Sequence, residues 1–505
     1  MRKLRNILLL LVAWTGMSCS NFLDMDIPDV LPDEEFWRNR SQLEAARNGV
    51  YTQLGNCVTY FMHWGDVRSG LYALNGTNTY ASQFINQELL TTNTWADWAN
   101  VYATINYANS FIKNAERVLD HDPTLEEDVQ HMLGEMRGIR ALCYFYLVRA
   151  FEDVPLHLEP YESDTQEVNV PATSEEVVLD TIEYDLKLAL DLCAESYSGA
   201  DNYGRVTKKA VKAIWADVKL WRGDYENCVT LCEELEQEYT GKRVREANWY
   251  SMFTNGNSEE SIFEYQYSND GVQSPLYSFA VASVSINNTT GNYQGNNRAY
   301  KREMDKIYPS TGGWDFSDTV RTAGTTYCNI SSDQKKFDVY KYLGIAAGYE
   351  ELVYRDNMTC YDAHFIFYRF REVLLIKAEA LGMLERYDEA VEAVNEIRRT
   401  TGLTETTVSR MGTGANFFDK LLAERCAELA FEGKQWFSML RIALHLGDEG
   451  TSLLIDRVAN SHLELTSSMV RSRLQNRASW YMPYYDTEVE HNHALKQKEY
   501  YRGRK

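Results

Sequence analysis

Helical periodicity of apolar residues is the feature that most limits the folds open to this 505-residue chain. Apolar side chains recur at spacings of three and four, which is typical of amphipathic helices that bury one face. Alternation typical of strands is scarce. The helical pattern covers residues 34–55, 94–120, 127–151, 175–195, 206–238, 366–400 and 416–444. The sequence therefore predicts a mainly α fold built from packed helices.

Helix ends can also be read from the sequence. Asp122-Pro123 and the segment from Asp153 to Pro155 predict two stops, because proline disfavours a helical conformation in the residue before it. Thr173-Ser174, followed by two glutamates, predicts a helix start with a capping hydroxyl and acidic residues in the first turn. These signals divide the periodic segments into separate helices.

Two segments align at a shift of 162 residues: "AIWADVKLWRGDYENCVTLCEEL" from Ala213 and "LIKAEALGMLERYDEAVEAVNEI" from Leu375. Aligning Tyr225 with Tyr387 also pairs Ala216 with Ala378. Small residues are expected where two antiparallel helices approach closely, and the aromatic residue after the turn is expected to pack between them. Both segments resemble a tetratricopeptide helix-turn-helix unit, which indicates a scaffold of stacked helix pairs.

Residues 240–365 differ in character, with stretches such as "SINNTTGNYQGNNRAY" that are rich in Asn, Gly, Thr and aromatic residues. Residues 56–93 show the same bias. Long irregular segments inside a compact fold are usually functional or disordered, and the aromatic content argues against disorder. We therefore expect these two loop-rich parts to carry a ligand site.

The first 18 residues have the features of a lipoprotein signal peptide. Arg2, Lys3 and Arg5 form a basic region, and the apolar run from Ile7 to Met17 is too short to span a bilayer. The stretch "GMSC" resembles a lipobox, so cleavage before Cys19 would leave that residue as a lipidated N-terminus, with residues 19–505 as one mature domain. The alternative is an ordinary secretory signal with an incidental cysteine.

The net charge indicates which binding partners are unsuitable, and the cysteine content bears on disulfides and metal sites. Removal of residues 1–18 lowers the number of basic residues from 51 to 48 against 73 acidic ones, a net charge of −25, which argues against nucleic acid and anionic lipid head groups. The other eight cysteines are too sparse for a disulfide scaffold, and most lie in helical stretches, where we expect them in the core. Cys228 and Cys232 share a helix face but lack further zinc ligands nearby.

Several stretches in order resemble the SusD/RagB family of outer-membrane nutrient-binding lipoproteins. After the lipobox, "NFLDMDIPDVLPDEEFW" and "WADWANVYATINYANSFI" are similar to its opening segments. "EMRGIRALCYFYLVRAFEDVPL" is similar to its most recognisable block, although Glu152 stands where glycine is usual. "YRFREVLLIKAEAL", "AVNEIRRTTGL" and "ERCAELAFEGKQWFSMLR" resemble later blocks, with Gln435 and Ser438 departing from the usual Arg and Asp. The C-terminal "YMPYYDTEVEHNHALKQKEYY" is a looser match.

The resemblance implies a superhelical scaffold of about four tetratricopeptide-like helix pairs and a more irregular ligand-binding part. It also implies a cell-surface lipoprotein of the outer membrane that binds oligosaccharides without catalysis and delivers them to a SusC-like TonB-dependent transporter. A branch of the family is associated with peptides, so a RagB-like peptide-binding protein is the alternative. A pure interaction scaffold and a glycosidase are the remaining alternatives.

The candidate ligand residues lie in the irregular segments and have the side-chain types that sugars need, which are flat aromatic rings and planar polar groups. They are Asp66, Arg68, Tyr72, Tyr80, Asn86, Tyr293, Asn296, Trp314 and Tyr327. A structural role, with Arg68 paired to Asp66, is the alternative for the charged residues. Aromatic residues in helix blocks are expected in the scaffold core instead: Trp98, Tyr102, Tyr144, Tyr146 and Trp436.

Catalytic and cofactor motifs are missing from the sequence. It has no P-loop, no G-x-S-x-G elbow, no H-E-x-x-H helix and no dinucleotide glycine fingerprint. "EHNH", with His491 and His493, has no identifiable further metal ligands. We expect no catalytic residue and no cofactor, and structural calcium stays open because of the acidic surface, although no loop has EF-hand spacing.

Overall fold

The computed structural model describes most of the chain and gives the arrangement of its helices. The described ranges are 35–74, 78–163, 166–244, 249–276, 362–462 and 465–504, with short pieces at 297–300, 321, 326–327, 336–339, 341–342, 344–347 and 351–354. The predicted signal peptide and Cys19 lie outside these residues. The described part is mainly helical, which confirms the predicted fold class.

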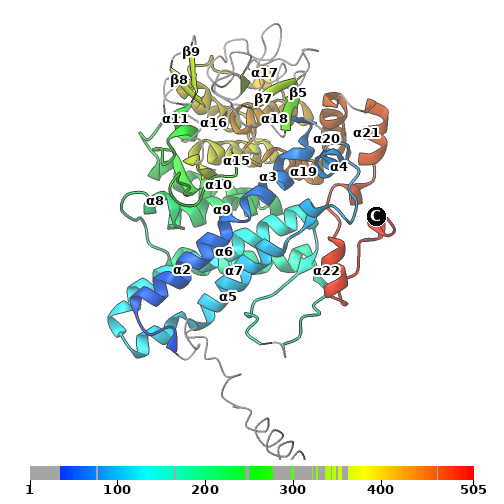
Figure 1. Cartoon of the computed structure of the whole chain (residues 1–505). Helices are drawn as coiled ribbons and strands as arrows, with labels where there is room; N and C mark the ends of the chain where they lie inside the picture. The colour runs from blue at the N-terminus through cyan, green and yellow to red at the C-terminus, as the bar shows by residue number, and fades with distance from the viewer. Residues whose placement is uncertain are drawn as a thin grey trace, which may run out of the picture.

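Four helix pairs form the scaffold (Figure 1). The pairs are α2 (Arg40–Gly55) with α5 (Ala99–Asn114), α6 (Glu126–Phe151) with α7 (Glu175–Leu192), α9 (Lys208–Arg222) with α10 (Tyr225–Glu238), and α15 (Phe370–Met383) with α16 (Tyr387–Thr400). Successive pairs contact one another through α5 and α6, α7 and α9, and α10 and α15. This confirms the predicted superhelical scaffold of about four tetratricopeptide-like pairs.

The aligned repeats occupy equivalent places in the third and fourth pairs. Ala216 and Ala378 are fully buried, as expected for close helix approach. Gly223 ends α9 in the left-handed region with φ of +78°, a conformation that glycine adopts without steric cost. Tyr225 and Tyr387 each begin the second helix of a pair and make ring contacts with His445 and Phe417, respectively.

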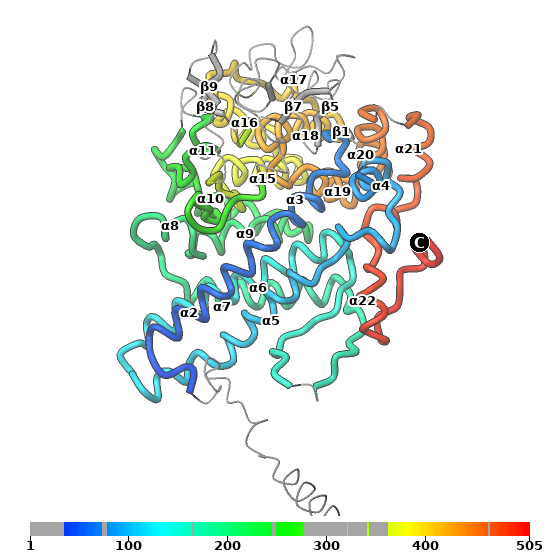
Figure 2. Tube along the Cα trace, in the orientation of Figure 1, coloured from blue at the N-terminus to red at the C-terminus, as the bar shows by residue number. Residues whose placement is uncertain are grey.

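The C-terminal helices pack against the N-terminal part of the described chain. They are α18 (Ala415–Leu429), α19 (Gln435–His445), α20 (Gly447–Ser461), α21 (Ser467–Leu474) and α22 (Asp486–His491). Helix α19 packs on α3 (Val58–Asp66), and α4 (Thr79–Ile85) lies beside α20 and α21 in the views of Figures 1 and 2. The N-terminal and C-terminal parts of the described chain therefore contact each other through α3 and α19.

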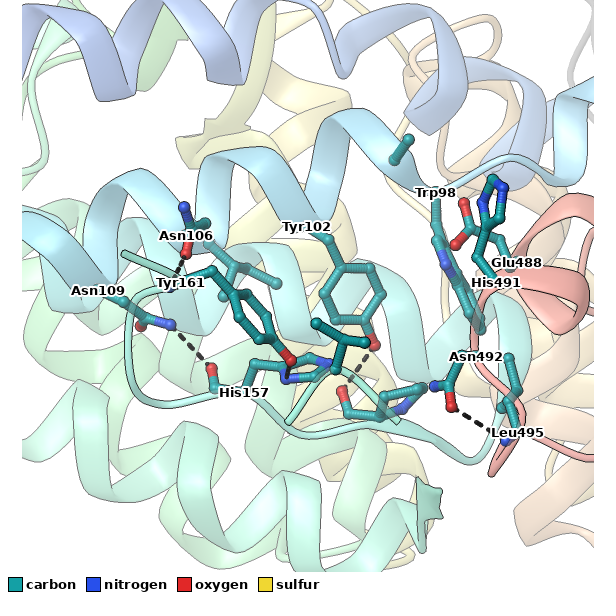
Figure 3. A pocket seen from close by; sticks show the side chains of 14 residues that line it. Trp98, Tyr102, Asn106, Asn109, His157, Tyr161, Glu488, His491, Asn492 and Leu495 are labelled. Carbon is teal, nitrogen blue, oxygen red and sulfur yellow. Dashed lines mark hydrogen bonds between the residues drawn. The ribbon is translucent and has the colours of Figure 1, made fainter. Parts of the chain in front are cut away.

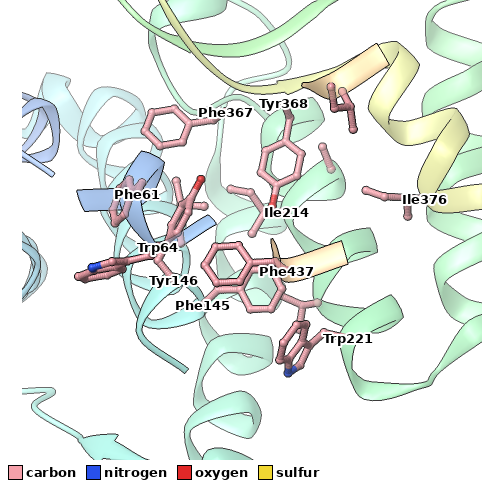
Figure 4. Packing of buried hydrophobic residues seen from close by; sticks show 14 of the residues in the cluster. Phe61, Trp64, Phe145, Tyr146, Ile214, Trp221, Phe367, Tyr368, Ile376 and Phe437 are labelled. Atoms are coloured by element: carbon pink, nitrogen blue, oxygen red, sulfur yellow. The ribbon is translucent and has the colours of Figure 1, made fainter. Parts of the chain in front are cut away.

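The expectation of an irregular segment at residues 56–93 is wrong for α3 and α4. Helix α3 was missed because most of its side chains are buried, so its sequence lacks the polar face of an amphipathic helix. Phe61 of α3 stacks on Tyr146 of α6 with ring centroids 3.7 Å apart, in the cluster shown in Figure 4. Trp64 packs edge-on to Phe151 at 5.2 Å. Helix α3 is therefore part of the core.

In the described ranges, the strands are short and lie in four small sheets. A four-stranded sheet has the order β1 (Tyr72–Leu74), β5 (Asn297–Tyr300), β7 (Lys336–Val339), β6 (Thr326–Tyr327). The two-stranded sheets pair β2 (Val154–Pro155) with β3 (Ala172–Thr173), β4 (Ser261–Tyr265) with β10 (Phe365–Arg369), and β8 (Gly344–Ala347) with β9 (Glu351–Tyr354). All paired strands run antiparallel.

The predicted helix boundaries hold, with one difference in capping. Helix α6 ends at Phe151, and α7 begins at Glu175. Ser174 occupies the capping position, but its hydroxyl makes no capping bond. The carboxylate of Asp153 accepts the hydrogen bond from the Glu175 amide instead, at 2.9 Å. The residues on either side of the α6–α7 connection are thereby held together.

Cysteines behave as core residues throughout the described part of the chain. Cys57, Cys143, Cys193, Cys228, Cys232 and Cys426 are free and buried. Among the described residues, no group of His, Cys, Asp and Glu is arranged to hold a metal ion, and no helix is long and apolar enough to cross a membrane.

Candidate functional site

The connection that follows β2, residues 156–161, runs back along α5 and is hydrogen-bonded to one face of that helix. Tyr102 donates a hydrogen bond from its hydroxyl to the Pro155 carbonyl at 2.6 Å. Asn106 accepts from the Tyr161 amide at 2.7 Å, and Asn109 donates to the His157 carbonyl at 3.0 Å. Positions 102, 106 and 109 share a helix face because they are spaced by four and three.

Helix α22 and the residues after it form the opposite wall. Asn492 donates from Nδ2 to the Val170 carbonyl at 2.6 Å, and its backbone carbonyl accepts from the Leu495 amide at 3.0 Å. Asn169 accepts from the His493 amide at 2.8 Å. The C-terminal segment is thereby fixed against the connection between α6 and α7, as its place beside that connection in Figure 2 also shows.

A pocket of about 300 Å³ lies between these walls (Figure 3). Aromatic groups from Trp98, Tyr102, His157 and Tyr161 line it. Further lining residues are Ala99, Ile105, Asn106, Asn109, Pro155, Val168, Glu488, His491, Asn492 and Leu495. Pockets that hold small ligands combine such an apolar lining with a few polar groups that fix orientation.

The aromatic groups have different exposure. Trp98 is only 3 % exposed and contacts the rings of Tyr102 and Phe151, with centroids 5.4 and 4.9 Å away. Tyr161 is 36 % exposed, and its hydroxyl lies 2.8 Å from Nδ1 of His157. Trp98 therefore forms a fixed floor, whereas Tyr161 stands at the rim, where it can meet a ligand from solution.

Burial shifts the protonation of three groups in the pocket. It lowers the pKa of His157, which favours a neutral imidazole at neutral pH. Burial raises the pKa of Glu488, while a hydrogen bond from Trp98 acts in the opposite direction. Burial, followed by the nearby Glu167 carboxylate, raises the pKa of Tyr161, so its phenol stays protonated and can donate a hydrogen bond.

Three of the predicted ligand residues are core residues, which corrects their assignment. Asp66, Arg68 and Tyr72 are at most 1 % exposed. Asp66 accepts hydrogen bonds from the backbone amides of Gly433, Lys434 and Gln435, at the start of α19, at 2.9 to 3.1 Å. Burial raises the pKa of Asp66 to about 7, although these N–H donors act to lower it. The Tyr72 hydroxyl donates to Asp66 at 3.4 Å.

Arg68 has a separate set of partners. Its guanidinium donates to the carbonyls of Ser479 and Trp480, both at 2.6 Å, and to the Gln87 side chain at 3.0 Å. It also lies over the Trp436 ring, 4.2 Å from the centroid. Arg68 and Asp66 were wrongly placed at a ligand site because residue type alone does not show burial, and the alternative of a mutual ion pair is not what holds them.

The other predicted residues divide into two groups. Tyr80 on α4 is 39 % exposed, and Asn86, which follows α4, is partly exposed, so both stay candidates. Tyr293, Asn296 and Trp314 lie outside the described residues, and Tyr327 is described only as part of β6. The roles of these four residues remain predictions.

Sequence reasoning missed the pocket between α5 and α22. Trp98, which directly precedes α5, and Tyr102 on α5 contribute to the packed scaffold, as expected, but they also line the pocket. Tyr144, Tyr146 and Trp436 are buried in the core. The spacing of Tyr102, Asn106 and Asn109 was the available signal, since polar groups at helical spacing mark one face. Nothing in the sequence placed α22 opposite that face.

The scaffold and pocket define a class: a helical protein of tetratricopeptide-like pairs with a ligand-sized hollow where inter-helix connections meet. Comparisons with known proteins identify the family. Residues 22–220 match the family model described as "Starch-binding associating with outer membrane", and residues 350–501 match the model described as "SusD family". The chain belongs to the SusD/RagB family.

Relatives span nearly the whole chain. SusD-like protein P38 of Formosa agariphila is 22 % identical over 490 residues, which cover 87 % of this chain and 92 % of P38. SusD-like protein P2 of the same organism is 26 % identical and covers 86 % of this chain and 89 % of P2.

Solved structures share the fold. A SusD superfamily protein from Bacteroides thetaiotaomicron superposes with a TM-score of 0.71 at 19 % identity, covering 92 % of this chain and 99 % of that one. A structure described as "Laminarin binding SusD-like protein" gives a TM-score of 0.69 at 18 % identity, with coverage of 92 and 99 %.

Proposed function

We propose that this protein is a non-catalytic surface lipoprotein that binds an oligosaccharide and delivers it to a SusC-like TonB-dependent transporter in the outer membrane. Cys19 would carry the lipid anchor. Membership of the SusD/RagB family, the starch-binding and outer-membrane description of one matching model, and the laminarin-binding structural neighbour support this proposal.

The pocket between α5 and α22 is the structural observation that supports a saccharide as the ligand. A pyranose ring has C–H faces that stack on aromatic rings and hydroxyls that bond to planar polar side chains. The rim ring of Tyr161, the floor of Trp98 and the side chain of Asn106 supply both kinds of contact. Its volume of about 300 Å³ is at the lower end for a ligand site and suits a short saccharide segment.

The lining of this pocket favours binding over hydrolysis. Glycosidases usually place two carboxyl groups on opposite sides of the scissile bond. Among the described lining residues, Glu488 is the one carboxylate. A captured saccharide is therefore expected to leave the pocket uncleaved.

Affinity electrophoresis in gels that contain laminarin or starch tests the proposal. The wild-type protein should be retarded by one of the two polysaccharides. Tyr161→Ala should bind that polysaccharide at least about tenfold more weakly, because the substitution removes both the aromatic ring that stacks on the sugar and a hydroxyl. Tyr184→Ala is the matched control, since Tyr184 is a 62 % exposed tyrosine on α7 that does not line the pocket. Equal retardation of both variants would show that the ligand does not bind in this pocket.

Other outcomes separate the alternatives. Shortening of a labelled laminari-oligosaccharide would indicate a glycosidase. Binding of tryptic peptides without polysaccharide retention would indicate a RagB-like peptide-binding protein. Affinity capture of the full-length protein from detergent-solubilised outer membranes should bring down a TonB-dependent barrel, and a capture without such a barrel would contradict the transporter partnership.

The predicted loop residues require their own test. Trp314→Ala and Tyr80→Ala should weaken retention without lowering the melting temperature if these side chains extend the saccharide site. Full retention of either variant would remove that residue from the site. The same measurement applies to Asn86, Tyr293, Asn296 and Tyr327.

A further inference from the structure

A second hollow, of about 320 Å³, lies on the scaffold between α8 (Asp201–Gly204), the end of α10 and the start of β4. Its main lining residues are Tyr203, Lys209, Tyr239, Lys242, Glu259 and Ser261. None of these residues lines the pocket between α5 and α22. The hollow is therefore a separate feature of the molecule.

Two ammonium groups converge on one aromatic ring in this hollow. Nζ of Lys209 lies 5.8 Å from the centroid of the Tyr239 ring, and Nζ of Lys242 lies 5.5 Å from it. Phe370 stacks on the same ring at 5.0 Å, and the Tyr239 hydroxyl donates to the Ser261 carbonyl at 2.9 Å. The ring is thereby held in place, and both lysines line the hollow beside it.

The pairing of charges along α9 makes Lys209 unusual. Lys208 lies 2.7 Å from Glu195, Lys212 lies 3.0 Å from Glu238, and Lys219 lies 2.8 Å from Asp224. Among the described residues, neither Lys209 nor Lys242 has a carboxylate within 4 Å. In a chain with a large excess of acidic residues, two neighbouring cations without close counter-ions are unexpected.

The electrostatics of Lys209 agree with this geometry. Burial lowers the pKa of Lys209, and repulsion from Lys242 lowers it further, while Glu238 and Glu195 act in the opposite direction at longer range. An anion placed between the two ammonium groups would relieve that repulsion and make charge-assisted hydrogen bonds. Glu259 is exposed and is the one carboxylate among the described lining residues, so it alone of that lining would oppose such an anion.

We propose that this hollow binds an oxyanion group, a carboxylate or sulfate ester, carried by an acidic saccharide. Lys209 and Lys242 would hold the anion, and the hydroxyl of Tyr203 would supply a neutral donor. The proposal rests on the proposed function only for the saccharide that carries the anion. It extends that function to charged glycans through a site distinct from the aromatic pocket.

The test follows the side-chain ammonium resonance of Lys209 while ligand is titrated into the full mature protein. Methyl glucuronide and glucose 6-sulfate should shift the resonance and raise the pKa of Lys209, whereas methyl glucoside, which has no charge, should not. Isothermal titration calorimetry with methyl glucuronide follows the variants, because Lys209→Gln lacks the observed ammonium group. Lys209→Gln and Lys242→Gln should each weaken binding about tenfold or more, since each removes one charge-assisted contact. Lys187→Gln is the control, since Lys187 is an exposed lysine on α7 outside the hollow.

Three results would overturn the proposal. Equal responses to methyl glucoside and methyl glucuronide would show that charge is not recognised. Undiminished binding in Lys209→Gln would place the anion elsewhere. A response to inorganic sulfate without any response to the charged sugars would indicate an adventitious ion only. Tyr161→Ala should leave the Lys209 response unchanged, so failure of the aromatic pocket and failure of this site are distinguishable.

Discussion

Arg441 donates two hydrogen bonds to Glu379, from Nε and Nη2 to the two carboxylate oxygens, each at 2.7 Å. The same guanidinium reaches Asp217 through Nη1 at 3.1 Å. Glu379 and Asp217 are equivalent positions of the two aligned repeats, so one arginine of α19 joins the third helix pair to the fourth. All three side chains are at most 4 % exposed.

Arg441→Met should lower the melting temperature by several degrees. Loss of the arginine removes both hydrogen bonds that Glu379 accepts from it and leaves that carboxylate beside Arg425, 3.8 Å away, while Asp217 keeps Arg149 at 3.2 Å. Removing one partner of a buried ion pair typically costs about 3 to 5 kcal/mol, and the remaining arginines place the expected cost at the lower end of that range. Arg386→Met is the matched control, because Arg386 makes a similar pair with Glu389 at 2.6 Å on the exposed surface of the fourth helix pair. Exposed pairs contribute about 1 kcal/mol or less, so the control should melt near the wild type. Thermal unfolding followed by circular dichroism measures both, and equal melting temperatures would contradict a structural role for Arg441.

Asp66→Ala should lower the free energy of unfolding and leave ligand binding close to that of the wild type. The substitution leaves three buried backbone N–H groups of Gly433, Lys434 and Gln435 without their acceptor, at a cost of about 3 kcal/mol or more. Retention on laminarin or starch, measured well below the melting temperature, should be close to that of the wild type. An unchanged melting temperature with lost retention would restore Asp66 to the ligand site.

The helical scaffold could be predicted because its signal is local. Periodicity within each of the pairs, and the similarity of the segments around Ala216 and Ala378, require no knowledge of distant contacts. Even the unusual Glu152 is informative in hindsight: it ends α6 with φ of +65°, a left-handed conformation in which glycine is favoured. The departure from the family's glycine is therefore a local strain at the helix end.

The candidate site could not be predicted in the same way because its walls come from distant parts of the chain. Asn492 bonds to Val170 across 322 residues, and Asp66 bonds to Gln435 across 369. Their residue types predicted ligand contacts for Asp66 and Arg68, but whether these side chains are buried depends on partners that are distant in the sequence. Trp98 shows the converse, since a scaffold residue also lines a pocket once α22 lies beside it.

Stability should fall as the pH falls through 6.5, partly because of His63. This side chain is 6 % exposed and stacks on Trp95 with ring centroids 3.5 Å apart. Burial lowers the pKa of His63 from its ordinary value of 6.5 to about 3, so the unfolded chain binds the proton more readily than the folded one. The stability contribution is fully present above pH 6.5 and is lost as the pH falls toward 3, and the loss amounts to about 2 kcal/mol at pH 5.

His63→Phe isolates this contribution, because phenylalanine can keep the stack on Trp95 and does not titrate. Burial also lowers the pKa values of His157 and His445, which titrate in both proteins and cancel in the comparison. Melting temperatures at pH 7.5 and pH 5 should differ more in the wild type than in the variant. Parallel pH profiles would show that His63 does not contribute.

Cys19→Ala should release the protein from the membrane. The apolar run from Ile7 to Met17 is too short to span a bilayer, and a lipid anchor would therefore depend on acylation of Cys19. Each buried methylene of an acyl chain contributes about 0.8 kcal/mol, so several chains on one cysteine hold a protein firmly and their loss removes the attachment. Fractionation of cells that express the wild type, Cys19→Ala and, as a control for a buried thiol, Cys232→Ala measures the effect. The wild type and Cys232→Ala should sediment with the outer membrane, and only Cys19→Ala should appear in the soluble fraction. A Cys19→Ala protein that is cleaved from its signal and still sediments with the membrane would contradict the lipid anchor.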